Sequence, residues 1–162
     1  MPNHRGFLTS RELGVPWYRV AWNYVIGGIS RWMPPCRAKN LMLKHLLGVG
    51  FGPRMNAMIN VDVFLDMWRP DLIFFGDGVF TGCGARFLSH RIVRREGRFK
   101  VQYGSIRLGE GAFVGGWSTV EGDVEIGDGA SVASMALVPW GHTVGAGRSA
   151  RASGVVARLL PV

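Results

Sequence analysis

The sequence predicts an all-β solenoid, a coil built of short parallel strands, and three observations support this fold class. Within residues 108 to 138, every sixth position is aliphatic: Leu108, Val114, Val120, Ile126, Val132 and Val138. The fifth place of each six-residue block is small or β-branched. The 24 glycines follow no three-residue period, which excludes collagen and suits a chain dense in turns. A strict six-residue repeat indicates a solenoid in which each repeat is one strand and one turn.

Residues 1–48 are predicted to form a basic helical arm ahead of the solenoid. Residues 1–14 are polar and basic, which indicates an extended lead-in without a signal peptide. Apolar residues then recur at helical spacing from Pro16 to Ser30, and a proline suits the first turn of a helix. A Pro-Pro pair separates this helix from a second one over residues 36–47, which ends at a glycine.

The first helix has two interpretations. Its uncharged run is too short to cross a membrane, because a spanning helix needs about 20 apolar residues. It could pack on the solenoid or on a neighbouring subunit, and we favour this interpretation. It could instead lie at a membrane surface, since Trp17, Trp22 and Trp32 with nearby arginines suit a headgroup boundary.

The solenoid is predicted to cover residues 49–144. Its beginning, residues 49–72, is irregular, and residues 75–90 return to clean six-residue blocks. Phe75 and Phe87 are large for a narrow core, so we expect small neighbours above and below them. After residue 144 the repeat ends, and residues 145–162 form a closing segment.

An excursion must leave the solenoid between Phe75 and Leu108, because these residues are 33 positions apart, which is not a multiple of six. Residues 91–104 contain no six-residue block and carry most of the loop charge. Loops that leave a rigid repeat are frequent carriers of function. We therefore place the excursion at residues 91–104.

These segments resemble the hexapeptide-repeat acyltransferases, and sugar O-acetyltransferases in particular. The resemblance covers residues 34–158 and rests on the repeat, on FLSH followed by a long loop and YGSIRLGEGAFVGG, and on the arm PPCRAKNLMLKHLLGVGFG. The closing GVVAR lacks the proline that this family carries there. The resemblance implies a left-handed parallel β-helix, a homotrimer, and acetyl-CoA or another acyl-CoA as co-substrate.

His90 is the predicted catalytic residue. It stands directly before the excursion, where the family carries its catalytic histidine. An imidazole titrates near neutral pH, so it can take a proton from a hydroxyl group that attacks a thioester. The resemblance further suggests that Asp66 and Tyr103 contact the acceptor, with Asp66 alternatively orienting the histidine. An acid in a turn can also serve only as a local cap.

The resemblance also implies a cofactor-binding set. Two pairs of small residues match corners along which relatives hold pantetheine: Gly115, Gly116, Ala133 and Ser134. The repeat itself also requires small corners, so these residues could be purely structural. The phosphates of CoA need basic groups, and three arginines lie in the closing segment: Arg148, Arg151 and Arg158.

The charge distribution argues against nucleic acid as a partner. The net charge is +8, with +6 in residues 1–48, +5 in residues 91–107 and −5 in residues 108–140. No aromatic platform or recognition helix accompanies the basic segments. An anionic co-substrate or membrane surface explains this distribution better. Two cysteines and four dispersed histidines indicate neither a disulfide framework nor a metal site, so we expect a cytoplasmic protein, with peripheral membrane contact through residues 1–48 as an option.

The combined prediction is an acetyl-CoA-dependent O-acetyltransferase that acts on a sugar or a lipid-linked sugar. Two alternatives remain open. The acceptor could be the amine of an amino sugar, which would make the protein an N-acetyltransferase. The altered closing segment could instead mark a solenoid that serves as a non-catalytic scaffold or binding subunit.

Overall fold

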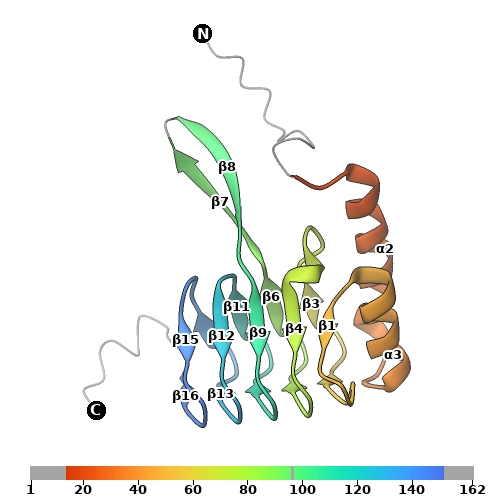
Figure 1. Ribbon diagram of the computed structural model, residues 1–162, viewed down its shortest axis with the longest axis vertical. Coiled ribbons are helices and arrows are strands. Elements are labelled where there is room, and N and C mark those ends of the chain that lie inside the picture. Colours follow the sequence, from red (N-terminus) through yellow and green to blue (C-terminus); the bar gives the residue numbers. More distant parts are fainter. Residues whose placement is uncertain (1–13, 96, 152–162) are drawn as a thin grey trace, which may run out of the picture.

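The computed structural model describes residues 14–95 and 97–151, which form a left-handed, three-sided parallel β-helix with helices at its N-terminal end (Figure 1). The first sheet contains β1 (Gly50–Phe51), β4 (Ile73–Phe75), β9 (Ile106–Leu108), β12 (Val124–Ile126) and β15 (Thr143–Val144). The second contains β2 (Met58–Ile59), β5 (Phe80–Thr81), β10 (Phe113–Val114), β13 (Ser131–Val132) and β16 (Ser149–Ala150). The third contains β3 (Phe64–Leu65), β6 (Arg86–Leu88), β11 (Thr119–Glu121) and β14 (Leu137–Val138).

The six-residue repeat stacks its aliphatic residues in columns inside the coil. Leu108 of β9 pairs with Ile126 of β12, eighteen residues later, and both are buried. Eighteen residues are three blocks of six, so each block supplies one side of the triangular coil. The glycines at the turns are needed where the backbone is left-handed: Gly111 and Gly129 have φ of +65° and +62°. The repeat therefore determines both the strand and the corner.

The core of the second coil is aromatic, which corrects the expectation of small neighbours above and below its two phenylalanines. The ring of Phe75 stacks on Phe51 of the preceding coil, with centroids 5.8 Å apart, and meets Phe87 of its own coil edge-on at 5.3 Å. Space is made within the coil instead: its remaining side, β5 of the second sheet, presents the smaller Thr81 to the interior, and Thr81 is fully buried. The rings are thus accommodated within one layer.

The excursion is an antiparallel hairpin of β7 (His90–Arg95) and β8 (Arg98–Tyr103) that projects from the β-helix (Figure 1). It leaves the coil after β6 and returns at β9, and its base pairs His90 with Tyr103. The parallel strands continue beyond residue 144, the boundary predicted from the sequence, because β16 pairs with β13.

The helical arm covers the N-terminal end of the coil. It consists of α2 (Trp17–Trp32), α3 (Arg37–Met42) and a π-helical turn, η1 (Leu43–Leu47), and a short 3₁₀ turn, η2 (Pro70–Leu72), precedes β4. The buried ammonium of Lys39 donates hydrogen bonds to the carbonyl oxygens of Met33, Ile59 and Asn60 at 2.8–3.1 Å. This lysine therefore ties the end of α2 to the first coil. No helix in the described part of the chain is long and apolar enough to cross a membrane.

Candidate active site

The predicted catalytic residue lies at the edge where the third sheet turns into the first. Asp66 follows β3, and His90 follows β6 in the next coil. The hairpin returns the chain to the same edge, because Tyr103 ends β8 opposite His90. Three residues that span nearly forty positions of sequence therefore meet at one edge.

Asp66 and His90 form the central pair of this site. Nδ1 of the His90 ring forms a hydrogen bond with Oδ2 of Asp66. Asp66 is 1% exposed, whereas the side chain of His90 keeps 24% of its surface accessible. Asp66 also accepts hydrogen bonds from the backbone N–H of Trp68 at 2.9 Å and from the hydroxyl of Ser89 at 3.0 Å. The carboxylate thus holds one nitrogen of the ring, and the opposite edge of the ring carries Nε2.

The electrostatics of the pair keep Asp66 negative. Burial by itself would raise the pKa of the Asp66 carboxyl, but the hydrogen bonds from His90, Trp68 and Ser89 favour the charged form and lower the pKa below its usual value. A carboxylate accepts hydrogen bonds, so the proton of the neutral imidazole belongs on Nδ1. Nε2 is then the nitrogen with a free lone pair, which is the form a general base requires.

Aromatic and basic side chains surround the pair. The indole of Trp68 stacks on the His90 ring with centroids 4.2 Å apart and planes 12° from parallel. The guanidinium of Arg69 lies over the Tyr103 ring at 5.6 Å and forms a bidentate ion pair with Asp71. Burial, and then the charge of Asp66, raise the pKa of the Tyr103 hydroxyl, so this phenol stays protonated at neutral pH. Trp68 and the carboxylate therefore fix both the plane and the tautomer of the imidazole.

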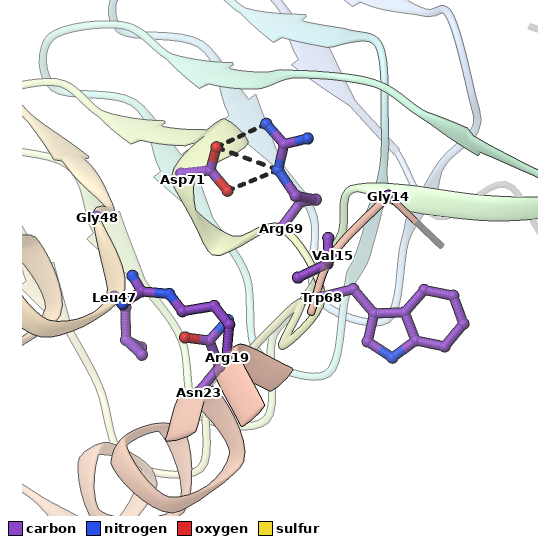
Figure 2. Close-up of a pocket in the computed structure, with 9 residues that line it drawn as sticks. All are labelled: Gly14, Val15, Arg19, Asn23, Leu47, Gly48, Trp68, Arg69 and Asp71. Carbon is purple, nitrogen blue, oxygen red and sulfur yellow. Dashed lines mark hydrogen bonds and ion pairs between the residues drawn. The ribbon is translucent and has the colours of Figure 1, made fainter. Parts of the chain in front are cut away.

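A cavity of about 320 Å³ adjoins the site at Trp68 and lies between the start of α2 and the loop that leads to η2 (Figure 2). Arg19 and Asn23 of α2 line it on one side, and Trp68, Arg69 and Asp71 line it on the other. The side-chain oxygen of Asn23 is buried and has no hydrogen-bond partner among the described residues. The cavity therefore presents the guanidinium of Arg19 on the side opposite Trp68, whose indole stacks on the His90 ring.

The predicted cofactor corners lie elsewhere on the chain. Gly115 and Gly116 follow β10, and Ala133 and Ser134 follow β13, so both pairs occupy the edge between the second and third sheets. The two corners stack directly, since a Cβ on Gly115 would meet the backbone nitrogen of Ser134 at 2.3 Å. A single chain thus brings the corners together with each other, but not with His90.

The three arginines assigned to the phosphates fall at the C-terminal end of the coil. Arg148 lies in the turn before β16, and Arg151 follows that strand; both are exposed. Exposed guanidinium groups suit the phosphates of an anionic co-substrate. Arg158 lies outside the described residues.

Trp68, Arg69 and Ser89 were missed by the sequence analysis. The pairing of the strands explains why Trp68 lies at the site. Leu65 of β3 pairs with Phe87 of β6, which places Trp68 level with His90. This register spans 22 residues rather than 18, because the loop with η2 enlarges the first coil. The six-residue period alone therefore could not align the two residues.

Comparison with known proteins identifies relatives only at the level of structure. No family model and no curated protein sequence matches the chain. Among solved structures, a hexapeptide-repeat acetyltransferase of Vibrio cholerae aligns with a TM-score of 0.62 at 15% identity, over 88% of this chain and 94% of that one. Its complex with acetyl coenzyme A aligns with a TM-score of 0.58 at 17% identity, over 81% and 84% of the two chains.

A maltose O-acetyltransferase of Clostridium difficile aligns with a TM-score of 0.53 at 11% identity, over 81% of this chain and 83% of that one. At identities this low, the structural likeness shows the fold alone. The chain therefore has the left-handed β-helix fold of the hexapeptide-repeat acetyltransferases.

Proposed function

We propose that the protein is an acyltransferase that moves an acetyl group from acetyl-CoA to a hydroxyl group of a sugar or a lipid-linked sugar. The observation that carries this proposal is the contact between Nδ1 of His90 and the buried carboxylate of Asp66. The fold adds support, since one of its structural neighbours is an acetyltransferase in complex with acetyl-CoA and another is a maltose O-acetyltransferase.

In the proposed reaction, Nε2 of His90 takes the proton of the acceptor hydroxyl while the oxygen attacks the thioester carbonyl. The new C–O bond forms, the C–S bond then breaks, and the imidazolium returns its proton to the departing thiolate. Asp66 stabilises the positive charge that appears on the ring, and Trp68 holds the plane of the ring. Backbone N–H groups would stabilise the negative oxygen of the intermediate.

Tyr103 and the cavity at Trp68 are suited to the acceptor. The Tyr103 ring lies 6.5 Å from the His90 ring, between centroids, and burial raises the pKa of its hydroxyl further above neutral pH, so it can donate a hydrogen bond. The cavity offers the guanidinium of Arg19 to hydroxyl or anionic groups. Acetyl-CoA would use the small corners and the exposed Arg148 and Arg151.

The test is thiol release from acetyl-CoA with a panel of sugars, amino sugars and sugar phosphates. The substitution His90→Ala should lower kcat about 10²- to 10⁴-fold, the usual cost of losing a general base. His45→Ala is the matched control, because His45 is exposed on η1, away from the site, and should keep the rate. Circular dichroism should show both variants folded.

Three outcomes would decide against parts of this proposal. Full activity of His90→Ala would remove His90 as the base. Transfer only to amino sugars would make the protein an N-acetyltransferase. Absence of thiol release with every acceptor would favour a binding subunit without catalysis.

A further inference from the structure

Helix α2 buries mainly polar and small residues and exposes its large apolar ones. This exposed side takes no part in the proposed reaction. The residues that it buries against the coil are polar or small, apart from one isoleucine: Asn23, Ile26, Gly27 and Ser30. The side that it exposes carries large aromatic and aliphatic side chains: Trp17, Tyr18, Trp22, Val25, Ile29 and Trp32. We call this exposed set the aromatic end face. Trp17 and Trp32, at its two ends, are 72% and 77% exposed.

The buried side of α2 is held firmly, so the helix cannot turn its aromatic residues inward. The Asn23 amide donates to the carbonyl oxygen of Met67 at 2.8 Å, and Arg31 forms an ion pair with Asp62. Gly27 packs so closely that a Cβ there would meet the sulfur of Met67 at 2.3 Å. A side chain larger than hydrogen at this position would have to displace the end of the Met67 side chain. The aromatic end face is therefore a permanent feature of the fold.

The position of this face favours a lipid surface over a neighbouring solenoid. Helices α2 and α3 lie beyond β1 at one end of the strand stack (Figure 1). Side-by-side packing of solenoids would use the flanks of the coil, where the three sheets and the candidate active site lie. The end would remain free. Among the described residues, only Leu46 bonds to this face, where its carbonyl oxygen accepts from the Trp22 indole. The other five side chains stay more than half exposed, and a contiguous exposed apolar patch marks an interaction site.

The charge around the face matches an anionic bilayer. No acidic residue occurs between positions 14 and 61. Arg37 and Lys44, on α3 and η1, are exposed basic residues in this arm. Tryptophan and tyrosine prefer the headgroup region, and basic side chains at the same level attract anionic lipids. We propose that the aromatic end face docks the protein on the surface of an anionic phospholipid bilayer without crossing it.

The test is flotation of the full chain with vesicles of phosphatidylglycerol and phosphatidylcholine, compared with vesicles of phosphatidylcholine alone. We expect binding to the anionic vesicles at 50 mM salt and weaker binding at 500 mM salt, within the range where salt screens surface charge. The variant Trp17→Ser/Ile29→Ser/Trp32→Ser should stay in the vesicle-free fraction. The variant Arg37→Gln/Lys44→Gln should bind about 25-fold more weakly, at about fivefold per charge.

The matched control is Met58→Ser/Phe113→Ser/Met135→Ser, which removes three exposed apolar side chains from the coil and should bind like the unaltered protein. The proposal is overturned if the unaltered protein fails to bind anionic vesicles, or if the serine variant at the aromatic end face binds equally well. Loss of vesicle binding together with dissociation of an oligomer, seen by light scattering, would instead assign the face to a second copy of this chain. None of these results depends on acyl transfer.

Discussion

Asp66 connects stability with the proposed chemistry at the scale of single residues. It is buried, yet three donors satisfy it: the His90 ring, the Trp68 backbone and the Ser89 hydroxyl. A buried carboxylate is tolerated only when it is paired in this way. The same contacts that stabilise the carboxylate also fix the ring of His90. A change at Asp66 should therefore affect the fold and the proposed catalysis together.

The depressed pKa of Asp66 predicts the pH dependence of this contribution. A group with a lowered pKa in the folded state stabilises the protein above its unfolded pKa of about 3.9, and the contribution disappears as pH falls through the folded pKa. Asp66→Asn should lower the free energy of unfolding at pH 7 by about 1–3 kcal/mol. The deficit should shrink below about pH 4. Urea unfolding from pH 3 to 7 measures it, and a deficit independent of pH would contradict the interpretation.

The arm and the hairpin are the two elements that depart from the repeat. The hairpin carries His90 and Tyr103 at its base, so its pairing brings these residues together across the excursion. The arm seals the N-terminal end of the coil through α2, α3 and the ammonium of Lys39. A solenoid exposes its core at both ends, so such a cap is required for stability.

Lys39, in the arm, predicts a second pH dependence of the free energy of unfolding. Burial lowers its pKa from 10.5 to about 8, although the nearby thiols of Cys36 and Cys83 oppose the shift. The unfolded chain then binds the proton more tightly between pH 8 and 10.5, so stability rises with pH across this window. Relative to Lys39→Met, the unaltered protein should gain up to about 3 kcal/mol from pH 8 to 10.5. If the free energies of unfolding of the two proteins changed with pH in the same way over this range, that result would contradict the burial of the ammonium.

The arrangement of the whole molecule makes the proposed site depend on a neighbour. His90 lies on one edge of the triangular coil, and the corners at Gly115 and Ser134 lie on another. If acetyl-CoA binds at those corners, the thioester can reach His90 only where two solenoids meet. We therefore predict a homotrimer in solution, measurable by light scattering, with sites shared between subunits.

Mixed oligomers test the shared site directly. His90→Ala should be inactive, and Ser134→Trp should block the corner where the co-substrate is proposed to bind. Co-expression of the two variants should restore part of the activity, because some interfaces then pair an intact His90 with an intact corner. The restored fraction is measured by thiol release. If mixing restores nothing while each variant still forms the native oligomer, the site lies within one chain.

The sequence alone determined the architecture, because the repeat is a local rule. From Leu108 to Val138 an aliphatic residue stands at every sixth position, the spacing of one side of a coil, and the structure follows this register through β9 to β14. The excursion followed from counting, since 33 is not a multiple of six. His90 and Asp66 were singled out through resemblance, and their contact stays consistent with that interpretation.

The contacts that depend on how coils of unequal length stack were decided only by the tertiary structure. The first coil is longer than eighteen residues, so the six-residue period could not predict that Trp68 lies level with His90. The sideways packing of Phe75 and Phe87 also depends on a layer shared by three sheets. For α2, periodicity indicated a helix, but which side it buries depended on the shape of the coil end, where Gly27 packs against Met67. Sequence fixes local conformation, whereas contact between distant segments fixes which face is left for a partner.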